Sequence, residues 1–253
     1  MPGETSPPPR TRPSGRVWFV LACAAAVIAF LAATLPGVYN VKHGRREYVV
    51  KDRIERIVFV SKGTGSLHIS PSHDGRVHVT GTSSISHDSR LIERHRVVDK
   101  TLTLTSSCTG SRFGILRRCN LNFRLQVPPA VALSIRTHIG KTTIRGVRGR
   151  LDFKSDVGIV DGSGCFKQAH FSLGFGGLKF HDSCVPELLR VRARAGDVEL
   201  TVPAGRYAVD ARTHHGGGVK RPFANIIEDP AAHDKLDIEL SWGGAIKIDG
   251  AGP

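Results

Sequence analysis

The segment SIRTHIGKTTI, residues 134–144, is the first of five similar stretches in the second half of the chain. The others read LDFKSDVGIVD (151–161), HFSLGFGGLKF (170–180), RVRARAGDVEL (190–200) and VDARTHHGGGV (209–219). Their aligned glycines are separated by 18, 18, 20 and 20 residues and are Gly140, Gly158, Gly176, Gly196 and Gly216. A near-constant period with one turn glycine per unit is typical of a β-solenoid, in which each unit forms one coil and stacks on its neighbours. The repeat predicts an all-β fold: a β-solenoid with coils of 18 to 20 residues.

Apolar residues alternate within each unit, as they do in strands that are buried on one side. Five residues before each glycine stand Ile135, Phe153, Phe171, Val191 and Ala211, and seven before stand Leu133, Leu151, Ala169, Leu189 and Val209. Positions two apart on a strand point to the same side. We therefore expect both columns to fill the interior. The alternation resumes after the glycine, so each unit should fold as strand, glycine turn and strand.

Weaker copies of the pattern flank the regular units. Residues 56–84 alternate around Gly63, Gly65 and Gly75, and the closing segment KLDIELSWGGAIKIDG (235–250) contains one more glycine pair. We expect one continuous domain over residues 46–250, with an irregular first part. The low aromatic content, 11 Phe, 3 Tyr and 2 Trp, also fits a single elongated β domain.

The N-terminus divides into three pieces. Residues 1–16 are rich in proline and polar residues, which predicts a disordered tail. Residues Val17 to Leu35 carry no charge over 19 positions, enough for a helix to span a bilayer, so residues 17–36 are expected to form a transmembrane helix. A cleaved signal peptide is the alternative, but the apolar run is longer than the ~7 to 15 residues of a signal sequence core. Residues 37–45 are expected to form a juxtamembrane linker.

Charge alone does not orient this anchor. Arginines precede it and basic residues follow it, and the whole chain carries a formal charge of +14. The cysteines favour a cytoplasmic N-terminus and an extracytoplasmic β domain, because disulfides persist mainly in oxidising compartments. We therefore expect a single-pass protein of the cell membrane, with the lipid bilayer as a partner through Val17 to Leu35.

Four cysteines outside the anchor can form two disulfides. Cys165 and Cys184 are 19 residues apart, about one coil, and stacked strands lie roughly 4.8 Å apart, which suits a disulfide. Cys108 and Cys119 flank a loop between two alternating segments and could close it. Four cysteines allow three connectivities, so the other two pairings stay open.

The repeats resemble the DUF4097 family of bacterial adhesin-like proteins. The resemblance rests on SIRTHIGKTTIRGV, on VRARAGDVELTVPAGRYAVDART and on the closing IELSWGGAIKIDG, and it covers roughly Ile57 to Gly250. It implies a β-solenoid on a cell-envelope protein. Other units replace the aspartate that follows Gly196, so no ligand or catalytic residue is carried over from the family.

One column of outward residues is basic. Four positions before the glycines stand Arg136, Lys154, Ser172, Arg192 and Arg212, which stacking would bring together. Neighbouring cations repel one another unless anions bridge them. The column therefore predicts a binding strip for anionic cell-wall polymers, acidic glycans or lipid headgroups. The alternative is a solvated face whose charge is partly offset by Asp152 and Asp210.

Metal, enzyme and nucleic-acid functions find little support in the sequence. Adjacent residues on a strand point to opposite sides, so a His-Asp dipeptide rarely chelates a metal; the four are His73–Asp74, His87–Asp88, His181–Asp182 and His233–Asp234. Acidic residues are scattered rather than paired, and no nucleophile elbow, P-loop or zinc motif is present. Positive charge without an aromatic platform does not predict specific nucleic-acid binding.

These observations favour a non-catalytic, adhesin-like interaction module without a cofactor, which binds an anionic cell-wall polymer or an envelope protein. Two alternatives remain at this stage. One is an accessory or sensory component of an envelope-stress system that binds a protein partner, and the other is a carbohydrate-active β-helix enzyme.

Overall fold

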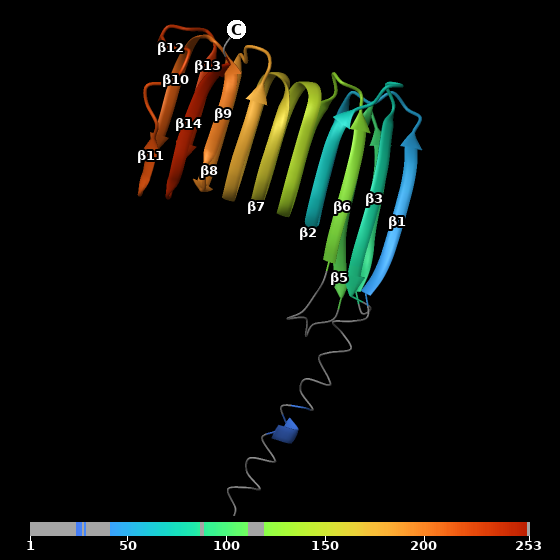
Figure 1. Cartoon of the computed structure of the whole chain (residues 1–253). Helices are drawn as coiled ribbons and strands as arrows, with labels where there is room; N and C mark the ends of the chain where they lie inside the picture. Colours follow the sequence, from blue (N-terminus) through green and yellow to red (C-terminus); the bar gives the residue numbers. More distant parts are fainter. Residues whose placement is uncertain (1–23, 27, 29–40, 87–88, 111–118, 252–253) are drawn as a thin grey trace, which may run out of the picture.

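The computed structural model describes residues 24–26, 28, 41–86, 89–110 and 119–251. Apart from the helical residues 24–26 and 28, its regular structure consists of β-strands, so the all-β prediction is confirmed. The strands join one 14-stranded sheet, whose main path runs from β1 to β12 and does not close on itself. Figure 1 shows the strands side by side along one long axis.

The N-terminal region, residues 41–127, is built largely of antiparallel pairs. β1 pairs with β3, β3 with β6, and β4 with β5, all antiparallel, whereas β2 is parallel to β5 and β6. The strands are β1 (Val41–Val50), β2 (Arg56–Pro71), β3 (Val77–Ser86), β4 (Ser89–Val98), β5 (Thr101–Gly110) and β6 (Cys119–Val127). β1 begins at Val41, inside the linker predicted for residues 37–45, because its first residues pair with the end of β3. The sheet therefore starts before the expected boundary at residue 46.

The parallel stack, residues 132–251, contains the regular repeats. β7 runs for 51 residues as an unbroken ribbon that winds through several coils (Figure 1). The pairings that link β2, β7, β8, β9, β13 and β14 are all parallel. The strands are β7 (Ala132–Asp182), β8 (Leu188–Ala195), β9 (Val198–Pro203), β10 (Gly205–Thr213), β11 (Gly217–Val219), β12 (Ile226–Glu228), β13 (Lys235–Leu240) and β14 (Gly244–Ala251).

The turns of successive coils meet backbone to backbone along one side, which we call the glycine edge. A Cβ atom added at Gly176 would lie only 1.8 Å from the carbonyl oxygen of Gly158, and one at Gly196 only 1.5 Å from that of Gly176. Only a residue without a side chain allows this approach. The glycines in contact in this way are Gly65, Gly140, Gly158, Gly176, Gly196 and Gly244.

The coils do not follow one another in sequence order at the C-terminal end. β13 pairs with β8 on one side and β10 on the other, and β14 lies between β9 and β11. Gly244, not Gly216, therefore stacks on Gly196, which corrects the predicted glycine alignment. A Cβ at Gly244 would meet the Gly196 oxygen at 2.1 Å, whereas nothing lies within 4 Å of a Cβ at Gly216. The fifth unit is displaced to the outside of the stack.

The predicted apolar columns form the core. Every residue of both columns is buried in the first four units, and only Val209 and Ala211 of the displaced fifth unit are half-buried. The ring of Phe171 lies 5.0 Å from that of Phe180, which faces it from the second strand of the same coil, and 6.1 Å from that of Phe153. Burial of each large apolar side chain contributes about 1.5–3 kcal/mol, so stacking rather than any single coil stabilises the domain.

The predicted transmembrane helix lies mostly outside the described residues. Within the part of the chain that the structure describes, no helix has the length and apolar character to cross a bilayer. The predicted tail, residues 1–16, also lies outside the described residues.

Candidate functional site

The predicted basic column is interrupted by an acidic residue. Ser172 pairs with Arg192 in the sheet, as the repeat predicts. Arg212, on β10, is expected to pair next to Arg192, but the strand beside β10 is β13. Glu239 of β13 stands between Arg192 and Arg212 and is in register with both. The four cations therefore do not form one continuous strip, because the last unit of the sequence is inserted between the third and fourth of them.

The two C-terminal members of the column are neutralised. The guanidinium of Arg192 donates two hydrogen bonds to the carboxylate of Asp237, at 2.7 and 2.8 Å, and lies 3.2 Å from Glu239. Burial would raise the pKa of Asp237, but hydrogen bonds from Arg192 and Arg190 outweigh burial and lower it. Arg212 pairs with Asp210 at 2.6 Å. Both arginines already have anionic partners within the protein.

The two other members of the column, Arg136 and Lys154, are exposed and have no carboxylate partner in the described part of the chain. Among the described residues, no acidic group lies within ion-pair distance of Arg136 or Lys154, which are neighbours on successive coils of β7. Arg56 and Arg150 stand on the same wall, likewise exposed and without an ion pair in the described part of the chain. We call Arg56, Arg136, Arg150 and Lys154 the basic patch.

An open groove of about 340 Å³ runs beside this patch. Arg56, Arg150, Asp152 and His170 line it, with Leu151 among the apolar residues at its base. Arg190 also lines the groove but is paired with Asp237 at 2.9 Å, so two unpaired cations, Arg56 and Arg150, face the single carboxylate of Asp152 in the lining. The groove can therefore accept an extended chain that carries negative charge.

The opposite wall, formed by the strands that follow the glycines, carries alternating charges. Glu199 lies between Lys179 and Lys247, at 3.1 and 3.4 Å, and Arg145 donates to Asp161 at 2.7 Å. The hydrogen bond from Lys179 is the largest cause that lowers the pKa of Glu199. These charges satisfy one another, so the second wall offers little net charge to a ligand.

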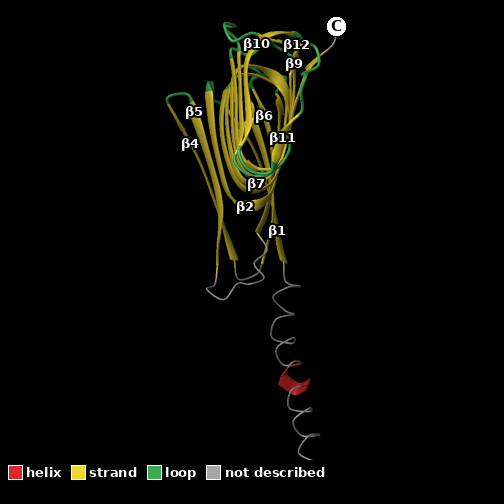
Figure 2. Ribbon diagram, turned by 90° about the vertical axis from the view of Figure 1, so that its left-hand side faces the viewer, coloured by secondary structure: helices red, strands yellow, loops and turns green. Residues whose placement is uncertain are grey.

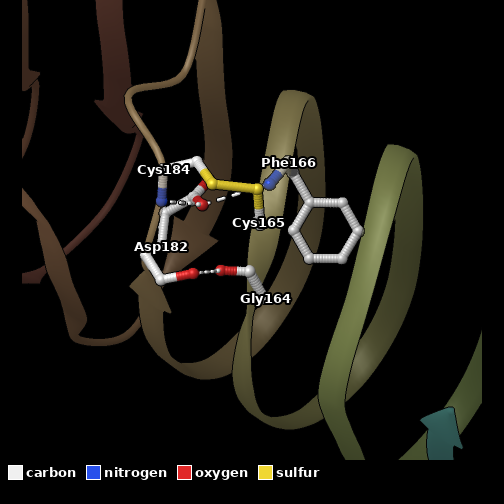
Figure 3. The surroundings of a disulfide bond; sticks show 6 residues. Gly164, Cys165, Phe166, Asp182 and Cys184 are labelled. Atoms are coloured by element: carbon white, nitrogen blue, oxygen red, sulfur yellow. Dashed lines mark hydrogen bonds between the residues drawn. A yellow bond between two sulfur atoms is a disulfide. The ribbon is translucent and has the colours of Figure 1, made fainter. Parts of the chain in front are cut away.

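Both predicted cysteine pairs are at disulfide distance. The sulfur atoms are 1.94 Å apart in Cys108–Cys119 and 1.99 Å apart in Cys165–Cys184. The second bond joins successive coils, with 4.8 Å between the Cα atoms, and Figure 3 shows it spanning neighbouring ribbons. The first joins the end of β5 to the start of β6 and bounds residues 109–118.

A buried carboxylate lies beside the second disulfide. Asp182 is fully buried, and its Oδ1 accepts hydrogen bonds from the backbone N–H of Phe166 and of Cys184, at 3.1 and 3.2 Å (Figure 3). Its Oδ2 has no hydrogen-bond partner among the described residues. Burial raises the pKa of Asp182 to about 7, and the two backbone hydrogen bonds only partly offset this effect. Sequence reasoning treated this residue only as half of a His-Asp dipeptide.

The His-Asp dipeptides do not converge on a common site. The side chain of His181 is exposed while that of Asp182 is buried, as expected for adjacent strand residues. Asp74 accepts a hydrogen bond from His78, not from His73, and His87 and Asp88 lie outside the described residues. Within the described ranges, no three histidine, cysteine or acidic side chains are grouped closely enough to hold a metal ion.

Arg56 and Arg150 were missed by the sequence analysis for different reasons. Arg150, Asp152 and Lys154 alternate along one strand, so a search for outward positions beyond the aligned column could have found Arg150. Arg56 precedes the regular repeats by many residues. Only the parallel pairing of β2 with β7, in which Arg56 is opposite Ala132, places it on this wall.

Comparison with known proteins yields structural likenesses of low sequence identity. No protein-family model matches the chain, and no curated protein does. A structure described as a "putative cell adhesion protein" from Clostridium sporogenes is similar over 83% of this chain and 100% of that chain, with 17% identity and a TM-score of 0.42. A "putative adhesin" from Bacteroides fragilis shares 16% identity over 82% and 97% of the two chains, with a TM-score of 0.34. A "putative lipid binding protein" from Parabacteroides distasonis shares 11% identity over 85% and 96%, with a TM-score of 0.24.

Proposed function

We propose that this protein is a non-catalytic, adhesin-like module of the cell envelope that binds an anionic polymer along its first wall. Its coils form an open-ended β-solenoid, held at the membrane by the uncharged segment Val17 to Leu35 with the β domain outside the cytoplasm. The ligand class is a polymer of the teichoic-acid or acidic-glycan kind.

The observation that carries this proposal is the uneven distribution of unpaired cations. Some basic side chains of the stack, such as Arg192 and Lys179, are matched by carboxylates of a neighbouring coil, while others, such as Lys141 and Lys220, have no ion pair among the described residues. What distinguishes the basic patch is that four unpaired cations lie on one wall. The basic patch has no such partners within the described residues. Strand residues rise about 3.3 Å each and coils are about 4.8 Å apart, so the patch spans roughly 13 Å along the strands and three successive coils, roughly 10 Å, across them. This spacing suits the repeated charges of a polymer better than a single small anion.

The disulfides support an extracytoplasmic domain, because such bonds are rare in reducing compartments. Labelling of intact cells with a membrane-impermeant maleimide, before and after reduction, tests this topology. We expect Cys165 and Cys184 to react only after reduction and without lysis. Reaction that requires lysis would place the domain inside the cell.

Binding is tested with the full-length protein in detergent and poly(glycerol phosphate) immobilised on beads. The double variant Arg136→Ser/Lys154→Ser should lose most of the retention at low salt, and retention of the parent protein should fall as salt screens the charges. The matched control is Arg206→Ser/Arg212→Ser, which removes the same charge from arginines that already pair with Asp229 and Asp210. Equal retention of both double variants would exclude the basic patch as the binding surface.

A further inference from the structure

The glycine edge carries an unusual concentration of exposed apolar side chains. Five of the large apolar residues that are exposed in the β domain lie within two positions of an edge glycine: Ile139, Val157, Ile159, Phe175 and Trp242. Their exposed fractions range from 39% for Ile139 to 62% for Trp242. Scattered exposed apolar residues are ordinary, but a contiguous group marks a surface that is covered in use.

The residues form a row because the coils are in register. Phe175 is paired with Ala195, and the backbone N–H of Trp242 donates to the carbonyl of Arg194 at 2.6 Å, so Trp242 lies on the coil next to Ala195. Ile139 and Val157 occupy the equivalent position on the preceding coils, one residue before Gly140 and Gly158. Four steps of about 4.8 Å give the row a length of roughly 19 Å.

The chemistry of the edge is that of a membrane interface. The guanidinium of Arg194 lies over the ring of Phe175 at 5.6 Å, and the ring of His215 lies 5.2 Å from that of Trp242. Aromatic rings beside cationic or polar groups favour the headgroup region, where apolar and hydrated groups meet. The nearby carboxylate of Asp156 is paired with His138 at 2.7 Å, and that of Asp197 accepts the N–H of Ala245 at 3.0 Å.

The start of the described β domain lies at this same end of the molecule. Val41 pairs with Ser86 at the end of β3, and the preceding residue of β3, Ile85, pairs with Cys119 at the start of β6. β6 in turn pairs with β2 beside Gly65, the first glycine of the edge. In Figures 1 and 2 the lower end of β1 and the lower turns of β7 face the same side of the molecule, with the end of β1 reaching further down than those turns.

The short connection to the anchor restricts where this end can be. Only residues 36–40 separate the apolar segment that ends at Leu35 from Val41. Five residues reach at most about 18 Å when fully extended. If Val17 to Leu35 spans the bilayer, the end of the domain that carries the glycine edge is held at the membrane surface.

We infer that the glycine edge contacts the outer surface of the lipid bilayer, with Phe175 and Trp242 in the headgroup region. This inference depends on the anchor in the proposed function, but not on polymer binding. It also places the basic patch on a wall that rises from the membrane, open to polymers that run beside it.

The two tryptophans of the chain allow a direct test, because Trp18 lies in the anchor segment and Trp242 on the edge. The full-length protein is reconstituted into phosphatidylcholine vesicles, with or without a lipid spin-labelled at the headgroup. In Trp18→Phe protein, which reports Trp242, we expect the labelled headgroups to remove most of the fluorescence. In Trp242→Phe protein, which reports Trp18, a lipid that is spin-labelled deep in its acyl chains should quench the fluorescence if the anchor is inserted.

The two readouts give four outcomes. Quenching of both tryptophans supports the inference, whereas quenching of Trp242 alone overturns the anchor on which the inference depends. Quenching of Trp18 alone overturns the inference and leaves the anchor intact, and quenching of neither overturns the anchor together with everything that depends on it.

A paired substitution shows whether the edge itself makes the contact. In the Trp18→Phe background, Ile159→Ser/Phe175→Ser should lower the headgroup quenching of Trp242 severalfold. Val185→Ser/Ile227→Ser is the matched control, since both residues are similarly exposed, at 48% and 58%, but lie away from the glycine edge. An equal effect of the two double variants would contradict docking through the edge.

Discussion

The N-terminal region and the parallel stack obtain the same buried interior by different means. In the N-terminal region, hairpin partners such as β4 and β5 align through a turn between adjacent strands. In the stack, each coil aligns on a coil that is distant along the chain, and the contact between glycine turns sets the register. The comparison teaches that a turn can be changed at little cost where it faces open space, as at Gly75 between β2 and β3, but not where a neighbouring backbone occupies the space of a side chain.

The largest expected effect comes from a methyl group placed on the glycine edge. Gly196→Ala would bring a Cβ within 1.5 Å of the Gly176 oxygen and force an L-residue into φ +131°. We expect a loss of at least ~4 kcal/mol in the free energy of unfolding, or failure to fold, since large losses arise from such backbone conflicts. Chemical denaturation followed by circular dichroism measures this loss.

Gly75→Ala is the corresponding change in the N-terminal region. Gly75 also has a positive φ, +70°, but nothing lies within 4 Å of an added Cβ. The free energy of unfolding should therefore fall by only about 1–2 kcal/mol, the cost of holding an alanine in a left-handed backbone conformation. Similar losses in both variants would refute the proposed difference between the regions.

Removal of the disulfides gives the next effect. The chain-entropy model gives ~3 kcal/mol for a loop of this size, so Cys165→Ser/Cys184→Ser should destabilise the stack by about that amount. The Cys108–Cys119 bond closes a shorter loop, with a separation of 11 rather than 19 residues. Its removal in Cys108→Ser/Cys119→Ser should therefore lower the free energy of unfolding slightly less. Limited proteolysis should locate the damage: near residue 165 in the first variant and in the N-terminal region in the second. Identical cleavage patterns would contradict this assignment.

Asp182 makes the stability of the stack depend on pH. Its pKa is raised from 3.8 to about 7 by burial, so the folded protein binds a proton that the unfolded protein releases. The stabilisation from the neutral form is complete below pH ~4 and is lost as the pH rises through about 7, by at most ~1.4 kcal/mol per pH unit. Asp182→Asn should flatten this decline and be more stable than the parent protein at pH 8. Denaturation midpoints between pH 4 and 8 measure it, and an unchanged slope in the variant would exclude Asp182 as the source.

The smallest effects distinguish paired from unpaired arginines on the first wall. Arg192→Ser deprives the 17% exposed carboxylate of Asp237 of two charged hydrogen bonds and should cost about 1.5–3 kcal/mol. Arg136→Ser should change stability by less than ~0.5 kcal/mol, because this exposed side chain has no carboxylate partner in the described structure. Thermal unfolding of the two single variants provides the comparison. A large loss in Arg136→Ser would mean that the basic patch is structural.

Much of the fold was predictable because its cause is local and periodic. Alternation placed Phe153, Phe171 and Val191 in the core, and the separation of Cys165 from Cys184 indicated one coil. These features repeat at a fixed interval, so the sequence carries them without any knowledge of distant contacts. The unit that ends at Val219 already contained weaker apolar residues, which agrees with its place at the outer end of the stack.

The candidate site was only partly predictable, because its charges come from strands that are distant in sequence. Glu239 and Asp237 neutralise Arg192 from the last unit, while Arg56 joins Arg150 from before the first regular one. The periodicity of the sequence does not indicate which coils pair with one another at the end of the stack.

By itself the sequence determined the strand and turn pattern, the identity of the buried residues and the turn glycines, since these follow from side-chain alternation and backbone freedom. Tertiary structure alone decided that the final unit lies between Gly196 and Gly217, and therefore which cations remain unpaired. The physical reason is that stacking energy is similar for any coil with an apolar interior, so the order of coils depends on backbone fit at the glycine edge and on charge pairing between walls.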